Sequence, residues 1–245
     1  MERKDFLKNG LTALGLVAVA PLMKACKKTD TVADSGSGSS GGGTSSCTVM
    51  PTETEGPFPI KNPSGYVRSN IVEDRTGVPF TINLTVKNTN GSCAAIAGAI
   101  VDIWHCDRQG NYSEYGGTSM QATDYTGSTY HFLRGRQVTD ANGLVSFTSI
   151  FPGWYSGRAP HIHVHVYNAS GVSKLITQIA FPKDVCDTVY TTSSYYSAKG
   201  VADTLNANDN VFGTPSTDLA QEMADSVTGS VSGGYTLTKV INAAF

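Results

Sequence analysis

From residue 80 onward the sequence repeats one pattern, in which a short apolar stretch is followed by turn residues. Apolar and polar residues alternate over residues 80–86, as in a strand with one buried face, and Asn-Thr-Asn-Gly follows as a turn at 88–91. Further strands are predicted at residues 97–105, 143–150, 161–167 and 174–181. Helical signal is confined to residues 217–227 and a short piece near Ala198. With 26 glycines in 245 residues, this spacing predicts an all-β fold, an antiparallel β-sandwich forming one domain at residues 47–245.

The composition favours a small molecule as the partner. The formal net charge is only −2, so there is no electrostatic case for binding nucleic acid or an anionic membrane surface. With 40% hydrophobic and 16% charged residues, the chain can bury an ordinary core.

Residues 1–25 have the pattern of a bacterial export signal. Arg3, Lys4 and Lys8 precede an apolar run over residues 11–22, which is too short to span a bilayer as a stable helix. The small residue before Cys26 resembles a lipoprotein cleavage site, so we expect an exported, periplasmic or cell-envelope lipoprotein anchored only through Cys26. The alternative is an amphipathic N-terminal helix of a cytosolic protein.

Residues 26–46 are rich in glycine and serine and have no means of forming a core. We expect a flexible tether there. A chain of this length has a root-mean-square reach of roughly 25 Å, enough to hold a domain just clear of a lipid surface.

Four cysteines remain if Cys26 carries a lipid: Cys47, Cys93, Cys106 and Cys186. An even number in an oxidising compartment indicates disulfides, and three connectivities are possible. We favour Cys93 with Cys106, which would join adjacent strands, and Cys47 with Cys186, which would tie down the start of the domain. Four buried free thiols are the alternative. No pair has the Cys-x-x-Cys spacing of a zinc site.

A His-x-His pair lies on the strand predicted at residues 161–167. Alternate residues of a strand share one face, so the Cα atoms of His161 and His163 lie ~7 Å apart and both imidazoles can reach one ion. His165 continues the face, but its Cα lies ~13 Å from that of His161, and we interpret it as structural. Turns present Tyr155 and Tyr112 near the pair. Two tyrosinates with two imidazoles favour Fe(III) over Zn(II) or Cu(I).

Three ordered motifs resemble those of the intradiol ring-cleavage dioxygenases, especially exported relatives of the protocatechuate 3,4-dioxygenase β subunit. They are Val-Asp-Ile-Trp-His-Cys-Asp-Arg-Gln-Gly-Asn-Tyr-Ser at residues 101–113, Arg-Gly-Arg-Gln-Val-Thr-Asp at 134–140 and Phe-Pro-Gly-Trp-Tyr-Ser-Gly-Arg-Ala-Pro-His-Ile-His at 151–163. Thr-Glu-Gly-Pro-Phe at 54–58 looks like that family's segment at the active-site mouth. The resemblance implies a β-sandwich with long active-site loops.

The resemblance also implies roles for individual residues. Tyr112 and His161 match the equatorial ligands of a non-haem Fe(III), and Tyr155 and His163 match the axial ones. Among the catalytic residues, Tyr155 also accepts a proton when the substrate displaces it, Arg158 stabilises developing negative charge, and Gln178 lies near the substrate. The implied reaction cleaves a catechol-type ring with O2, between the two hydroxylated carbons, to a muconate-type diacid.

Two features depart from the family pattern. Only Ser156 and Gly157 separate Tyr155 from Arg158, where many relatives have a longer insertion. There is also no obvious N-terminal helical dimerisation domain. The particular catechol and the oligomeric state are therefore left open.

Two other functions compete with this interpretation. A zinc-dependent hydrolase would use His161 and His163 with Asp107 or Glu114 as a third ligand. A non-catalytic exported binding module would use Trp104, Trp154 and the tyrosines as a stacking platform for a glycan or aromatic polymer.

Overall fold

The computed structural model describes residues 47–121, 123–127, 129–213 and 216–245. The predicted signal peptide at residues 1–25, Cys26 and the tether at residues 26–46 lie outside these ranges. Within the described part of the chain, no helix has the length and apolar character needed to cross a bilayer.

Strands are the main regular elements of the described domain. They are β1 (Pro79–Asn88), β2 (Ala94–Ala95), β3 (Ile100–Trp104), β4 (Arg134–Val138), β5 (Leu144–Ile150), β6 (His161–Tyr167), β7 (Ser173–Ala180), β8 (Ser226–Ser230) and β9 (Gly234–Ala243). The helices are α1 (Lys183–Thr192) and α2 (Ser216–Glu222), with 3-10 turns η1 (Pro63–Tyr66), η2 (Thr89–Gly91) and η3 (Asn206–Asn208).

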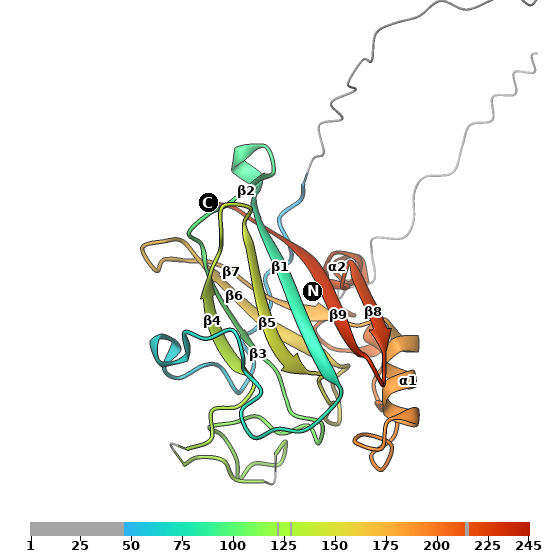
Figure 1. The fold of residues 1–245 in the computed structure, drawn as a ribbon. Coiled ribbons are helices and arrows are strands. Elements are labelled where there is room, and N and C mark those ends of the chain that lie inside the picture. Colours follow the sequence, from blue (N-terminus) through green and yellow to red (C-terminus); the bar gives the residue numbers. More distant parts are fainter. Residues whose placement is uncertain (1–46, 122, 128, 214–215) are drawn as a thin grey trace, which may run out of the picture. The chain divides into compact units, whose positions relative to one another are not determined.

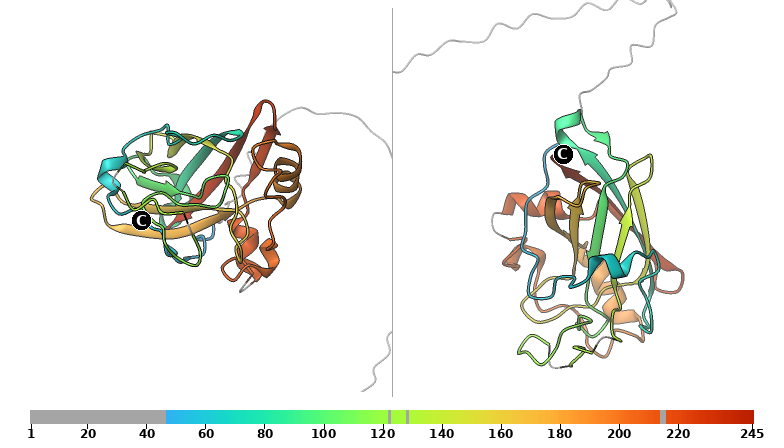
Figure 2. Two further views of the ribbon diagram at one scale, coloured as in Figure 1. Left: turned by 90° about the horizontal axis from the view of Figure 1, so that it is seen from below. Right: turned by 90° about the vertical axis from the view of Figure 1, so that its left-hand side faces the viewer.

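The strands form two sheets that lie face to face (Figures 1 and 2). One sheet has the order β4-β3-β6-β7, and all its pairs are antiparallel. In the other, β1 pairs with β9, β9 pairs with β8, and β5 and β2 pair with successive parts of β1. The pair β1–β9 is parallel and the rest are antiparallel. The predicted all-β sandwich is confirmed, with this one parallel pair added.

The inner faces of both sheets supply one hydrophobic core. Along β1 and β6 every second side chain is an apolar member of this core, as the two-residue period of a strand requires: Phe80, Ile82, Leu84 and Val86 from β1, and Ile162, Val164 and Val166 from β6. Burying each of these side chains contributes about 1.5–3 kcal/mol. The alternate residues of β6 are the histidines, so the same strand that builds the core presents His161, His163 and His165 on its outer face.

The helical predictions need correction. Residues 217–227 were expected to be helical throughout, but α2 ends at Glu222 and β8 begins at Ser226. Around Ala198 the chain forms turns rather than a helix. The sequence pattern also missed α1, which packs Cys186, Val189 and Tyr190 into the domain.

The favoured cysteine pairing was wrong. Cys47 is bonded to Cys93, with Cα atoms 5.8 Å apart, and Cys106 and Cys186 are buried free thiols. The expected pairs fail because their members belong to different parts of the fold. Cys93 follows β1 in one sheet and Cys106 follows β3 in the other, while Cys186 lies on α1.

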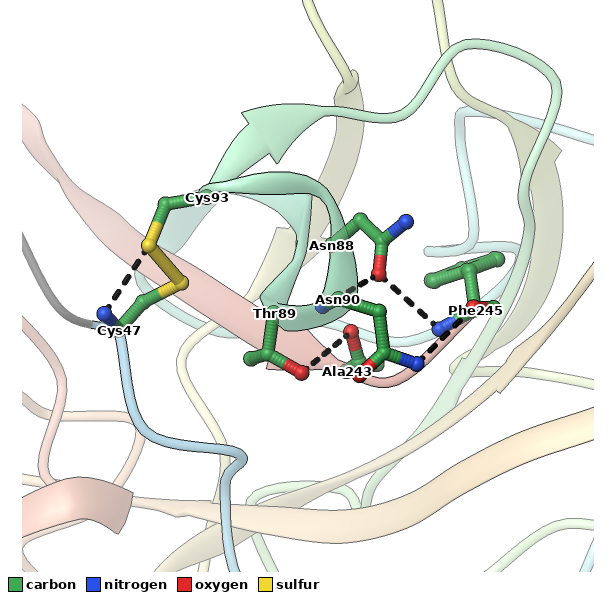
Figure 3. The surroundings of a disulfide bond; sticks show 7 residues. All are labelled: Cys47, Asn88, Thr89, Asn90, Cys93, Ala243 and Phe245. Atoms are coloured by element: carbon green, nitrogen blue, oxygen red, sulfur yellow. Dashed lines mark hydrogen bonds between the residues drawn. A yellow bond between two sulfur atoms is a disulfide. The ribbon is translucent and has the colours of Figure 1, made fainter.

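The disulfide lies at the end of the domain where the C-terminus also lies (Figure 3). The Phe245 N–H donates to Asn88 Oδ1 at 3.1 Å, and Asn90 Nδ2 donates to the Phe245 carbonyl at 3.1 Å. Nearby, Met50 N–H donates to the Asn242 carbonyl at 3.0 Å. Both ends of the folded chain are thus fastened to the turn after β1.

Candidate active site

The histidine pair lies on the outer face of the four-stranded sheet. His161 and His163 alternate with Ile162 and Val164, which enter the sandwich core. Both histidines are nonetheless buried, because loops and the start of the domain cover this face. Trp104 on β3 is the Cα partner of His163, and its indole stacks on the imidazole.

Four donor atoms converge beside this strand. Nε2 of His161 lies 3.2 Å from Nε2 of His163, 3.2 Å from Oη of Tyr112 and 3.4 Å from Oη of Tyr155. The structure therefore brings together all four residues predicted as iron ligands, although the tyrosines come from two different loops. Two phenol oxygens and two imidazole nitrogens within this small space are a donor set for one metal ion.

A polar turn positions Tyr112 after β3. Oδ1 of the buried Asp107 accepts the N–H groups of Gln109 and Asn111, both at 2.9 Å, which fixes a tight turn. Gln121 then binds both polar groups of the Tyr112 backbone: its Oε1 accepts the N–H at 2.6 Å, and its Nε2 donates to the carbonyl at 2.8 Å. The predicted turn is present, and Gln121 is a support that the sequence did not indicate.

The loop that carries Tyr155 packs closely against the first one. A Cβ atom on Gly153 would lie 2.3 Å from the Asp107 carbonyl oxygen, so only glycine permits this approach. Tyr190 on α1 also supports this loop, because its Oη donates to the Pro152 carbonyl at 2.9 Å. The two tyrosine loops thus fix each other, which explains how Tyr155 reaches the histidines.

Burial sets the protonation states in the site. It lowers the pKa of His161 to about 3 and that of His163 well below the usual range, and the charge of Arg158 acts in the same direction. Burial also raises the pKa of Tyr112 well above 10 and that of Tyr155 to about 12. The imidazoles are neutral, which is their metal-binding form. The phenols stay protonated unless a cation drives their protons off, and a strongly charged ion such as Fe(III) has that effect.

The ring nitrogens facing away from the cluster differ between the two histidines. His161 donates from Nδ1 to the Ala159 carbonyl at 2.6 Å, which leaves the lone pair of Nε2 directed at the tyrosines. Nδ1 of His163 is buried and has no hydrogen-bond partner within the described residues. The contact between His161 and the Ala159 carbonyl is the usual arrangement for a histidine at a metal centre.

Arg158 and Gln178, predicted to be catalytic, form one hydrogen-bonded group. Arg158 donates from Nη2 to Gln178 Oε1 at 2.7 Å, and Gln178 donates from Nε2 to the Thr54 carbonyl at 2.9 Å. Gln178 is fully buried and Arg158 is 8% exposed. The other side of the guanidinium is bound by Asp209, a residue that the sequence did not point to.

The segment from Thr54 to Phe58 lies against the site, as its resemblance to a mouth segment predicted. Thr54 accepts the hydrogen bond from Gln178, and the Phe58 ring stacks on Tyr112 with centroids 4.8 Å apart. Phe58, Trp104, Cys106, Tyr112 and Tyr155 form an apolar cluster separate from the main core. The donor atoms therefore lie in largely apolar surroundings.

The geometry does not support the zinc alternative. Within the described ranges, no three His, Cys, Asp or Glu side chains are placed to hold one metal ion. Asp107 is occupied by its own turn and by Arg75 at 3.3 Å. Glu114 instead binds Tyr66 and lies 3.0 Å from His131.

The stacking platform of the binding-module alternative is also incomplete. Trp104 is 1% exposed and lies under His163, so it is unavailable to a surface ligand. Trp154 is only partly buried, but its indole N–H donates to the Gly200 carbonyl at 2.9 Å and Lys199 lies over its ring.

Comparisons with known proteins agree with the geometry. Residues 60–219 match a family model described as Dioxygenase. The chain is 32% identical over 130 residues to a chlorocatechol 1,2-dioxygenase of Rhodococcus opacus, covering 45% of this chain and 46% of that protein. It is 27% identical over 155 residues to catechol 1,2-dioxygenase 1 of Acinetobacter lwoffii, covering 55% and 47%. The match spans about half the length of these curated relatives.

Two solved structures extend the comparison over most of the domain. An intradiol ring-cleavage dioxygenase from Tetranychus urticae has 31% identity and a TM-score of 0.70, covering 81% of this chain and 95% of that one. The dioxygenase domain of a dioxygenase carbohydrate-binding protein fusion from Streptomyces sp. SirexAA-E has 25% identity and a TM-score of 0.55, covering 80% and 99%.

Proposed function

Since this chain belongs to the intradiol ring-cleavage dioxygenase family, we propose that it cleaves a catechol-type aromatic with O2 between the two hydroxylated carbons. The product is a muconate-type diacid, and the cofactor is non-haem Fe(III). The observation that carries this proposal is the convergence of Tyr112, Tyr155 and His163 on Nε2 of His161, within 3.2–3.4 Å.

The donor set fits ferric iron better than the alternatives. Hard anionic oxygen with neutral imidazole suits Fe(III), and His161 is already oriented by its bond to the Ala159 carbonyl. When bound, the iron would supply Lewis-acid activation of a catechol dianion. Tyr112, Tyr155, His161 and His163 are the residues that would hold it.

Tyr155 is the better placed of the two tyrosines to move a proton. Its side chain keeps some contact with solvent at 6% exposure, whereas Tyr112 is fully buried beneath Phe58. Once a bound metal ion has removed its own proton, Tyr155 Oη would accept a proton from a substrate hydroxyl as substrate enters, and Tyr112 would stay in place.

Arg158 stabilises the negative charge that develops on the substrate. Its guanidinium is held rigid by Gln178 on one side and Asp209 on the other, so little reorganisation is needed when charge appears. Gln178 links the arginine to strand β7 and is itself fixed by the Thr54 carbonyl.

A titration with candidate substrates tests the proposal. Purified protein loaded with Fe(III) is expected to show a visible tyrosinate-to-iron band. Under anaerobic conditions, catechol, protocatechuate or hydroxyquinol should shift this band, and admission of O2 should convert the bound compound into its ring-opened diacid. Protein that stays colourless after ferric loading, or that binds zinc stoichiometrically in preference to iron, would contradict the proposal.

We also propose that the chain is exported as a lipoprotein anchored at Cys26, with the domain on a tether. The Cys47–Cys93 disulfide supports an oxidising compartment. Mass spectrometry of the processed N-terminus tests this: a diacylglyceryl-modified Cys26 is expected, and an intact Met1 in membrane-free cytosol would exclude it.

A further inference from the structure

We infer that Asp209 is the positioning residue of this site, since one carboxylate holds both Arg158 and the peptide that orients His161. The inference rests on the proposed function, because it assigns a role within that reaction. Asp209 follows η3 and reaches across to the segment between Tyr155 and β6.

The first branch runs from Asp209 to the arginine. Nε of Arg158 donates to Oδ1 at 3.1 Å and to Oδ2 at 2.9 Å. Because Nη2 also binds Gln178, the guanidinium is held at two of its nitrogen atoms, and the plane of the group is fixed. The direction in which its remaining N–H groups point is therefore set by Asp209 and Gln178 together.

The second branch runs through the backbone to the histidine. Oδ2 of Asp209 accepts the Ala159 N–H at 2.7 Å. The Ala159 carbonyl in turn accepts Nδ1–H of His161 at 2.6 Å. Ala159 is thus held at both polar groups, and its carbonyl fixes the ring orientation of His161. A shift of the Asp209 carboxylate would move this carbonyl, and with it Nε2 of His161.

The carboxylate itself is held firmly in the ionised form. It is 1% exposed, and Oδ1 also accepts the N–H groups of Val211 at 2.8 Å and Phe212 at 3.3 Å. Burial acts against the charge, but the bonds and charge of Arg158 outweigh it and lower the pKa of Asp209. A buried carboxylate with this many donors has little freedom to move.

The test compares Asp209→Asn with a matched pair elsewhere in the same domain. Asp102 is equally buried and binds Arg136 through both oxygens, at 2.6 and 2.7 Å, and its Cα partner on β6 is His165 rather than a histidine of the donor cluster. Asp102→Asn therefore removes a buried carboxylate–arginine pair without touching the site. Arg158→Lys serves as a second comparison, because it disrupts the first branch and leaves the second intact.

We expect Asp209→Asn to lower kcat and to weaken ferric-iron affinity, each by about 10–100-fold, and to shift the visible band. Arg158→Lys should lower kcat while leaving iron affinity and the band unchanged. Asp102→Asn should alter only the unfolding temperature. If Asp209→Asn changes kcat alone, as Arg158→Lys does, or changes nothing but stability, as Asp102→Asn does, the two-branch role is wrong.

Two further measurements keep the outcome decisive. If Asp209→Asn does not fold, Asp209→Glu keeps the charge but moves the carboxylate by one methylene group, and it should show the same combined loss in smaller measure. An Asp209→Glu protein with wild-type iron affinity and band would overturn the inference. A wild-type protein that binds no ferric iron and opens no catechol ring would instead refute the proposed function, which separates the two failures.

Discussion

The indole of Trp104 lies flat against the imidazole of His163, with ring centroids 4.8 Å apart and planes 1° from parallel. Trp104→Ala removes this contact and should cost about 3–5 kcal/mol of folding free energy. It should also weaken iron binding, because His163 loses the surface that holds its ring. Phe147→Ala, in the main core, is the control and should cost similar stability without loss of iron. Thermal unfolding and iron content measure both effects; equal iron loss in the two variants would contradict the prediction.

Removing one predicted ligand should abolish metal binding. Tyr112→Phe and His161→Ala are each expected to lose iron and visible colour, because each takes away one of four converging donors. His165→Ala is the control. His165 lies on the same strand face but is bound by Ser173 at 2.8 Å and by Glu55 at 3.1 Å, so this variant should keep its iron. Retention of iron and colour by Tyr112→Phe or His161→Ala would show that the ligand assignment is wrong.

Gly56 permits the covering segment to approach His163. A Cβ there would lie 3.2 Å from Cε1 of His163, and the backbone φ is +70°. Gly56→Ala should therefore cost about 1–2 kcal/mol for the left-handed backbone and also weaken iron binding through the contact. Gly157→Ala is matched, since its φ is +87° with nothing within 4 Å of the added methyl. It should lose stability only. Isothermal iron titration of both variants makes the comparison, and equal iron affinities would argue against the contact.

Two neighbouring carboxyl groups, the buried Glu222 and the half-buried Glu53, should make stability depend on pH. Glu222 is fully buried, and burial together with the charge of Glu53 raises its pKa from 4.5 to about 8. The folded state thus favours the neutral form, so its contribution is complete below pH 4.5 and is lost as pH rises towards 8. Glu222→Gln, neutral at every pH, should lose less stability between pH 5 and pH 9 than the wild type. Unfolding temperatures across that range test this; a difference that does not change with pH would refute it.

The sequence pattern predicted β6 residue by residue because two periodic signals coincide there. Histidines alternate with Ile162, Val164 and Val166, so both the core face and the site face can be read from the same stretch. The tyrosines are different. Tyr112 and Tyr155 meet the histidines through loop packing that no periodicity describes. Turn residues beside each tyrosine, together with the resemblance to a known family, indicated their place.

Long-range pairing accounts for most of what the sequence did not reveal. β9 alternates, but Lys239 occupies one of its buried positions and hides the pattern, and its parallel pairing with β1 is non-local. The β-branched residues of α1 lower its intrinsic helix propensity, which explains why the sequence did not indicate a helix. The burial of Cys186, Val189 and Tyr190 on one side stabilises the helix in the folded domain. Asp209 belongs to no motif, since its importance comes only from what the fold places beside it.

The Cys47–Cys93 bond gives the domain a mechanical property. Tension applied to the chain ahead of Cys47 passes through the two sulfur atoms into the end of β1, a strand paired with β9 along almost its whole length. Thr54 and Phe58, which lie against the site, come after the disulfide-bonded Cys47 in the sequence. A pull from the N-terminal side is therefore carried by the sheet, and it does not displace Thr54 from Gln178 or Phe58 from Tyr112.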